Sequence, residues 1–201
     1  LTSDYLYKDV FTLKDVRKPE TLEKLVQALA FQIGSQVSYR ELSDLIKVDK
    51  GTIERYIRLL EEAFIVFRLP SYSRNLRNEL KRSRKIYFWD TGVRNAALNQ
   101  FTSFELRSDK DHLWENFMIA ERMKYTQNEN LMRKSYFWRT TRNNEIDYIE
   151  AYDSEIQAYE IKWTGKDKHR FPVAFRNNYP HANLNVVDKD NYNEFLNIQG
   201  S

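Results

Sequence analysis

The chain has 201 residues, of which 41% are hydrophobic and 14% aromatic, enough for one large or two small cores. Its 32 basic and 29 acidic residues give a formal net charge of +3, so any nucleic-acid binding must depend on local patches. Cysteine is absent, which excludes disulfides and thiolate metal sites. No apolar run reaches the roughly 18 residues of a membrane span, and we expect a cytoplasmic protein without membrane partners.

Residues 1–20 are expected to link this chain to a domain that precedes it. The sequence begins at Leu1 without a methionine and shows neither a signal peptide nor a low-complexity segment. We therefore interpret it as a fragment of a longer protein. Pro19 stands where the first helix would begin, because proline suits the first position of a helix.

The stretch 21–89 predicts a winged helix-turn-helix domain. Its first part has apolar residues at helical spacing and ends near Gly34. Ser38 and Glu41 then form a capping box, the signature of a second, short helix. The apolar residues of that helix that we expect to face inward are Leu42, Leu45 and Ile46.

A turn at residues 48–51 leads to a third helix at 52–63, and residues 64–69 change to strand character. This is the element order of a winged helix, whose third helix can enter a groove of DNA. The exposed residues of this segment that would contact DNA are Lys50, Thr52, Arg55 and Arg58. Acidic residues on the same helix weaken that interpretation, and winged helices also serve as protein contacts, so both functions stay open.

A basic run follows between Tyr72 and Tyr87. Residues 74–85 carry six basic side chains against one acidic side chain, as a wing that grips a phosphate backbone would. A charged, solvated loop explains the same composition. The basic residues are Arg74, Arg77, Lys81, Arg82, Arg84 and Lys85. Residues 86–89 then predict a buried strand.

Residues 90–201 predict a mixed sheet flanked by helices. Asp90 and Gly92 suit a turn into a short helix at 93–98. The elements expected from residue 111 onward are a helix, strands at 135–139, 145–149 and 157–162, a helix at 166–178, a strand at 183–187 and a helix at 192–198. The fold class is thus α/β (α+β), a winged helix followed by a domain with the order αβββαβ.

One hairpin of this sheet brings three charged side chains together. Asp147 lies on its first strand, while Glu160 and Lys162 lie on the second, where a spacing of two directs both side chains to one face. Asp153 and Ser154 supply the turn. Two carboxylates can hold a hard divalent ion, and an ammonium can orient the attacking water or stabilise charge on a phosphorane. A solvated hairpin face is the plain alternative.

This pattern resembles the PD-(D/E)XK nuclease superfamily. Asp147 takes the acidic position and Glu160-Ile161-Lys162 the E-x-K, although no proline precedes Asp147 as the motif would have it. The resemblance implies a restriction-endonuclease-like αβββαβ fold that binds Mg²⁺ and cleaves DNA. It implies Asp147, Glu160 and Lys162 as catalytic residues, with the backbone of Ile161 as a further ligand. The first helix of that fold commonly supplies another acidic residue, which here is Glu115.

Longer stretches resemble the C-terminal region of a family of prokaryotic AAA+-type ATPases. The most specific are K-I-Y-F-x-D-T-G at residues 85–92 and E-N-F at 115–117. The resemblance implies an upstream ATPase domain as a partner of this region, and ATP binding only there. Gly165-Lys166 lacks the glycine-rich loop of a Walker A motif.

Three functions remain open at this point. The first is a Mg²⁺-dependent nuclease or a DNA binder derived from one. The second is a non-catalytic interaction and regulatory tail of the ATPase, in which the same residues form a charged pocket without turnover. The third is a winged-helix DNA-binding regulator. The histidines at 112, 169 and 181 lack the spacing of a zinc site.

Overall fold

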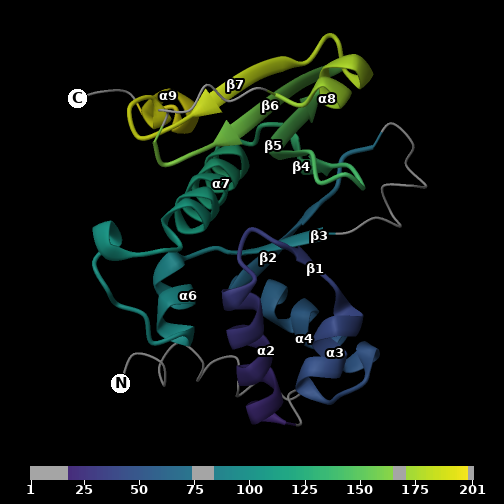
Figure 1. Ribbon diagram of the computed structural model, residues 1–201, viewed down its shortest axis with the longest axis vertical. Coiled ribbons are helices and arrows are strands. Elements are labelled where there is room, and N and C mark those ends of the chain that lie inside the picture. The colour runs from purple at the N-terminus through teal and green to yellow at the C-terminus, as the bar shows by residue number, and fades with distance from the viewer. Residues whose placement is uncertain (1–17, 74–83, 165–170, 199–201) are drawn as a thin grey trace. The chain divides into compact units, whose positions relative to one another are not determined.

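The structure is a computed structural model of the chain, and it describes residues 18–73, 84–164 and 171–198. The fold is mixed α/β, as the sequence predicts (Figure 1). The chain divides into two compact units, the first made of residues 1–68 and 83–108 and the second of residues 69–82 and 109–201.

Three helices open the described part of the first unit: α2 (Pro19–Phe31), α3 (Tyr39–Ile46) and α4 (Lys50–Glu62). Ser38 caps α3, because its hydroxyl accepts a hydrogen bond from the Glu41 N–H at 3.3 Å. The predicted capping box is thereby confirmed for its Ser38 half. Asp49 caps α4 in the same way, accepting from the Thr52 N–H at 2.9 Å.

A three-stranded sheet completes the winged-helix order. Its strands β1 (Gln36–Val37), β2 (Val66–Pro70) and β3 (Arg84–Phe88) lie in the order β1-β3-β2. β1 is antiparallel to β3. The fully buried side chains of this core come from all three helices and from β2 and β3, and include Leu22, Leu42, Ile53, Val66 and Ile86.

Two residues of this unit differ from expectation. Leu45, predicted to face inward, is 65% exposed, because α3 buries only the side on which Leu42 lies. Lys85, predicted as part of an exposed basic run, is fully buried on β3, where it pairs with Gln36 of β1. Four more basic residues of that run, Arg74, Arg77, Lys81 and Arg82, lie outside the described residues.

The short helix α6 (Thr91–Ala97) belongs to the first unit, whereas the sequence pattern predicts it in the second domain. Its residue Ala97 lies in the core of the first unit, which explains the assignment. Asp90 caps α6 by accepting from the Gly92 N–H at 2.6 Å. A single 3₁₀ turn, η1 (Phe104–Leu106), follows.

The second unit has the predicted order αβββαβ followed by a terminal helix. Its elements are α7 (Lys110–Asn128), β4 (Lys134–Arg139), β5 (Glu145–Tyr152), β6 (Glu155–Ile161), α8 (Val173–Asn178), β7 (Asn183–Val187) and α9 (Tyr192–Leu196). The first residues of the helix predicted at 166–178 lie outside the described residues.

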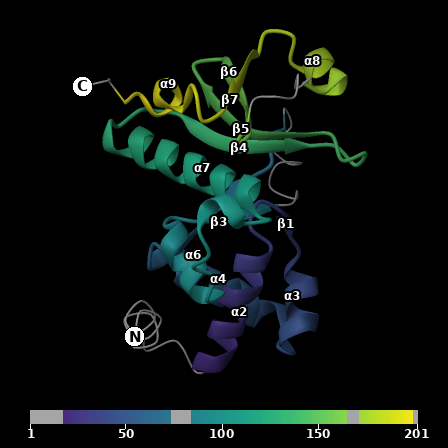
Figure 2. The same ribbon diagram turned by 60° about the vertical axis from the view of Figure 1, so that its left-hand side comes forward.

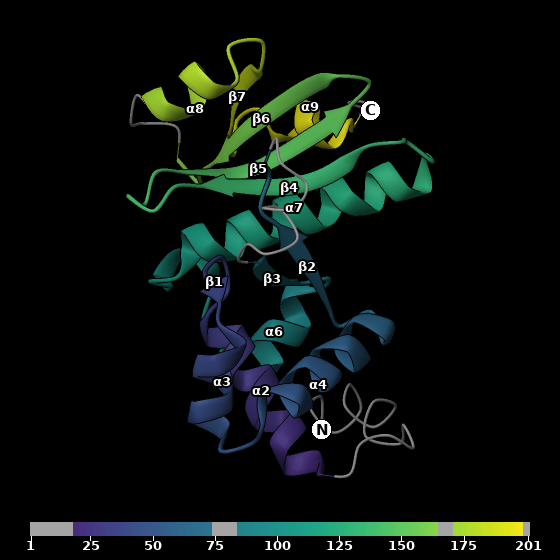
Figure 3. The same cartoon turned by 90° about the vertical axis from the view of Figure 1, so that its right-hand side faces the viewer.

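Its sheet has the strand order β4-β5-β6-β7, with β7 parallel to β6 and the other pairs antiparallel. The β5–β6 hairpin turns at Asp153 and Ser154, whose φ angles of 43° and 69° suit a two-residue type I′ turn. Helices lie on both faces (Figures 2 and 3). On one face of the sheet, Phe175 of α8 packs in a cluster with Ile149 of β5. On the other face, the ring centres of Tyr148 of β5 and Phe195 of α9 lie 6.1 Å apart.

No helix in the described parts of the chain is both long and apolar enough to cross a membrane.

Candidate functional site

The pairing of β5 with β4 shifts register between Ile146 and Ile149. Two residues of β5, Asp147 and Tyr148, therefore lie opposite the single residue Phe137 of β4, which is a β-bulge. The bulge explains why Ile146 and Ile149, three residues apart, enter the same core cluster. Bulges are common beside active sites because they redirect a side chain, and this one redirects Asp147.

β5 and β6 separate at the same point. Their last paired residues are Tyr148 and Tyr159, and one further step of this register would place Asp147 opposite Glu160. Like charges directly opposite each other repel. Instead, the Asp147 side chain replaces the missing backbone partner, because its Oδ2 accepts a hydrogen bond from the Ile161 N–H at 2.8 Å.

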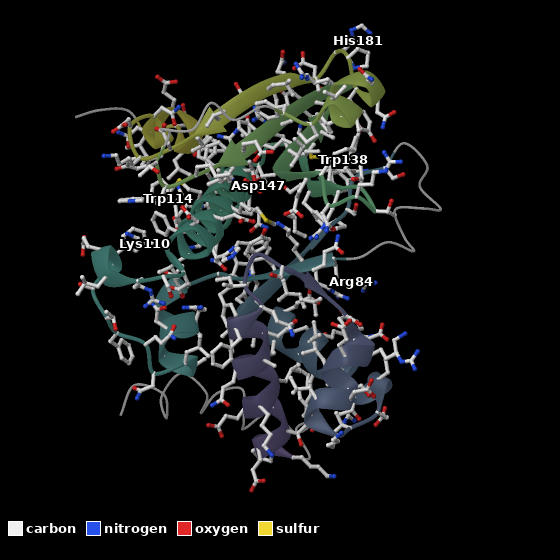
Figure 4. All side chains as sticks on the ribbon, in the orientation of Figure 1. Arg84, Lys110, Trp114, Trp138, Asp147 and His181 are labelled. Atoms are coloured by element: carbon white, nitrogen blue, oxygen red, sulfur yellow. The ribbon has the colours of Figure 1, made fainter. Side chains whose placement is uncertain are left out.

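Lys162 joins the two carboxyl groups. Its Nζ donates to Oδ2 of Asp147 at 2.9 Å and lies 3.5 Å from Oε2 of Glu160. The side chains of Asp147 and Glu160 are only 8% and 12% exposed, and that of Lys162 is 29% exposed. The structure thus brings together the three residues that the sequence predicts as the charged cluster, with Asp147 labelled in Figure 4.

The two carboxyl groups have unequal electrostatics. Burial raises the pKa of Glu160 to about 8, and the charge of Asp147 adds to this rise, whereas Lys162 opposes it. Burial alone would lower the pKa of Lys162, but the attraction of the acidic side chains around it, Asp147 first among them, outweighs burial and the pKa of the ammonium rises. At pH 7, Glu160 is therefore mostly protonated and Lys162 is charged.

The backbone of Ile161 points into the opening between β5 and β6. The neighbouring Lys162 N–H donates to the carbonyl of Val187 on β7 at 2.9 Å. Backbone groups of successive strand residues point to opposite sides, and both groups of one residue point the same way. The Ile161 carbonyl therefore faces the β5 side, as its N–H does when it donates to Asp147.

Glu115 approaches this cluster from α7 without completing a ligand set. Its side chain is buried, and its charge contributes to the raised pKa of Lys162. Among the described residues, however, no group of three or more Asp, Glu, His or Cys side chains is placed to hold a metal ion. A site with Asp147 and Glu160 as its two carboxylates fits this geometry better than one with Glu115 as a third.

A second buried cluster, centred on Glu150, was missed from the sequence. Arg122 of α7 binds both carboxylate oxygens, at 2.6 and 2.9 Å, and Arg133 donates to Oε2 at 2.7 Å. Burial favours the neutral acid, but these two guanidinium groups outweigh it and lower the pKa of Glu150. The cluster ties α7 to β5 and so fixes the helix that carries Glu115. The sequence did hold one signal of this cluster, since the acidic Glu150 stands between the apolar residues Ile149 and Ala151.

On the winged helix, the predicted DNA-contact residues Lys50, Arg55 and Arg58 are exposed on α4. Thr52 is not free for a base contact, since its Oγ1 donates to Oδ2 of Asp49 at 2.6 Å.

In the part of the basic run that the structure describes, Arg84 contacts Tyr39 of the same unit. The guanidinium of Arg84, labelled in Figure 4, lies 5.0 Å from the ring centre of Tyr39. The next residue, Lys85, is buried, so we remove it from the candidate DNA-contact surface.

Comparison with known proteins gives two family matches. Residues 1–103 match "Domain of unknown function (DUF8612)" and residues 110–198 match "Domain of unknown function (DUF4143)". The two matches meet close to the division between the two units at residues 108 and 109. No solved structure matches.

The relatives are longer proteins. An "Uncharacterized protein" of Mycobacterium tuberculosis is 28% identical over 163 residues, which cover 80% of this chain and 36% of the relative. One of Haemophilus influenzae is 24% identical over 195 residues, which cover 94% and 43% respectively. One of Methanocaldococcus jannaschii is 30% identical over 94 residues, or 45% and 20%. The chain thus spans less than half the length of these relatives.

Proposed function

The chain belongs to the DUF8612 family, and we propose that it is the DNA-binding, nuclease-like C-terminal region of a longer AAA+-type ATPase, with a divalent-metal site at Asp147, Glu160 and Lys162. The observation that carries the proposal is the meeting of two buried carboxyl groups and a lysine where β5 and β6 separate. More than half of the length of each of these relatives lies outside the matched region, and we propose an upstream ATP-binding domain in that remainder.

The donor set suits a hard divalent ion. Asp147 and Glu160 would each provide one carboxylate oxygen and Ile161 its carbonyl, and Mg²⁺ commonly fills the rest of its octahedral shell with water. Zinc is a poor fit, since a structural or catalytic zinc site would need histidine or cysteine ligands that this cluster lacks. When bound, such an ion would stabilise charge on a phosphate and activate a water molecule.

Lys162 has a role of its own in this proposal. Its pKa is raised, so its ammonium keeps its proton at neutral pH and cannot act as a general base. It now lies between the two carboxyl groups, where it offsets the charge of Asp147. With an ion on the carboxylates, the ammonium would be released to hold a phosphate oxygen or to orient the attacking water.

A structural role explains this geometry less well. A hairpin selected only for stability has no reason to bury an acid whose pKa is raised to about 8, because a neutral or apolar residue would avoid that cost. Residues that destabilise a fold often belong to functional sites.

Metal calorimetry tests the proposal. Wild-type chain titrated with Mn²⁺ should show one binding site, and Asp147→Asn and Glu160→Gln should abolish it while far-UV circular dichroism stays unchanged. Glu155→Gln, which removes an exposed acid of the same strand β6, should bind as the wild type does. Equal binding by all four proteins would remove the nuclease-like interpretation.

Turnover separates an active nuclease from a regulatory tail that keeps only the pocket. The full-length protein, with and without ATP, would be incubated with plasmid and single-stranded DNA in Mg²⁺ or Mn²⁺ beside a Lys162→Ala control. Cleavage that Lys162→Ala abolishes supports the nuclease. Metal binding without cleavage of either DNA supports the non-catalytic tail.

DNA contact by the winged helix is a second candidate function of the same chain. It is favoured by the exposure of Lys50, Arg55 and Arg58 on α4, the helix that enters a DNA groove in such domains. A footprint on duplex DNA that Arg55→Ala and Arg58→Ala weaken would support it, and an unchanged footprint would count against it.

A further inference from the structure

Four aromatic rings form a group centred on Trp114. Trp114 directly precedes Glu115 on α7, and Trp163 directly follows Lys162 after β6. Their ring centres lie 5.1 Å apart in an edge-to-face contact, so two residues adjacent to the site in sequence also meet in space. Phe117 and Tyr192 extend the group, with ring centres 6.2 and 5.6 Å from that of Trp114. Trp114 is labelled in Figure 4.

Simple core packing does not account for this aromatic group. Phe117 is 39% exposed and Trp163 is only half-buried, so two of the rings present surface to solvent. Trp114 is 8% exposed, yet its Nε1 has no hydrogen-bond partner among the described residues. A buried donor without an acceptor is costly, and a phenylalanine would fill the same space without that cost.

From this arrangement we propose that the aromatic group of Trp114, Phe117, Trp163 and Tyr192 is a stacking surface for an unpaired base, so that the substrate of the adjoining site is a single-stranded nucleic acid. The inference rests on the proposed nuclease-like function and adds its substrate class. Every base has a π-face that stacks on aromatic rings, and only an unpaired, unstacked base exposes that face. A base held on these rings would bring its phosphate to Lys162, the residue before Trp163.

Intact duplex DNA, the alternative substrate, would stack poorly on this surface. Bases inside a duplex are already stacked on one another, and extruding one costs a few kcal/mol. We assign contact with duplex DNA instead to the exposed basic residues of α4. The two binding modes therefore depend on different residues and respond separately to substitution.

Binding without metal tests the inference independently of catalysis. A fluorescein-labelled ten-residue oligothymidylate would be titrated with wild-type chain in EDTA, beside a labelled 20-base-pair duplex. Trp163→Ala and Phe117→Ala should each weaken binding of the single strand by roughly 5- to 150-fold, the effect of losing one stacked base. Both should leave duplex binding unchanged. Trp163→Phe should retain most of the single-strand affinity, because it keeps an aromatic face.

A second test variant and one control keep the result decisive. Phe117→Ala alters an exposed side chain and should fold normally even if Trp163→Ala does not. Met132→Ala removes another exposed apolar side chain of the same unit, 93% exposed, and should bind both probes as the wild type does. The inference is overturned if Phe117→Ala binds the oligothymidylate like the wild type, or loses single-strand and duplex affinity equally. Loss of Mn²⁺ binding in Asp147→Asn with single-strand binding retained would separate the two sites.

Discussion

Replacing Glu160 by glutamine should stabilise the fold, and increasingly so as the pH rises. Burial and the charge of Asp147 raise the pKa of Glu160 from its ordinary 4.5 to about 8 in the folded chain. The folded state therefore holds this proton more tightly than the unfolded state does. By linkage, the wild type loses stability as the pH rises from 4.5 to about 8. Glutamine does not titrate, so the variant is spared this loss.

The magnitude follows from the same shift. One pKa unit corresponds to about 1.4 kcal/mol, so Glu160→Gln should change the free energy of unfolding little at pH 4. The gain should reach about 3 kcal/mol at pH 7 and at most about 5 kcal/mol above pH 8. Lys162 keeps its hydrogen bond to Asp147 in the variant, so no unpaired charge offsets the gain.

Urea unfolding at pH 5, 7 and 9 in EDTA measures this prediction. Three of the four tryptophans, Trp114, Trp138 and Trp163, lie in the second unit, so tryptophan fluorescence mainly reports its unfolding. Glu155→Gln on the same strand is the matched control and should show no such pH dependence. A Glu160→Gln variant that is no more stable than the wild type at pH 9 would refute the electrostatic reasoning.

Three further predictions concern other parts of the molecule. Glu150→Gln should destabilise the second unit by about 3 to 5 kcal/mol in thermal or urea unfolding at pH 7, since Arg122 keeps a buried charge without its carboxylate. Because the pKa of Glu150 is lowered from its ordinary 4.5, the stability advantage of the wild type should shrink as the pH falls below 4.5, and a constant difference would contradict this. Arg58→Ala should reduce the slope of log affinity for duplex DNA against log salt concentration by about 0.9, whereas salt-insensitive binding would exclude a phosphate contact. Glu115→Gln should weaken Mn²⁺ binding in calorimetry far less than Glu160→Gln does, and equal losses would make Glu115 a ligand.

Much of the second unit was predictable because its chemistry is local in sequence. The alternation around Asp147 and the spacing of Glu160 and Lys162 indicated two strands and one shared face. The positive φ angles of Asp153 and Ser154 confirm the predicted turn. Elements of this kind follow from period and turn residues alone.

The bulge at Asp147 was not predictable, because it depends on how β5 pairs with β4. Strict alternation would direct Asp147 and Tyr148 to opposite faces, whereas the bulge places both opposite Phe137. Long-range partners also explain the buried Lys85 and the Glu150 cluster. A charged residue in an apolar strand signals that some partner exists, but its identity, here Arg122, comes from the fold.

Exposure of apolar residues was the other point where sequence reasoning failed. Leu45 stands at helical spacing with the buried Leu42, yet it is 65% exposed. Helical period defines an apolar side of a helix but not the width that a neighbouring element covers.

The most direct measurement of the central claim is a crystal structure of the chain grown with Mn²⁺, with the ion located by its anomalous scattering. We expect one ion held by an oxygen of Asp147, an oxygen of Glu160 and the carbonyl of Ile161, at about 2.1 to 2.2 Å, with Lys162 moved away from Asp147. A structure at saturating Mn²⁺ in which Lys162 still bridges the two carboxyl groups and no ion lies between them would contradict this expectation.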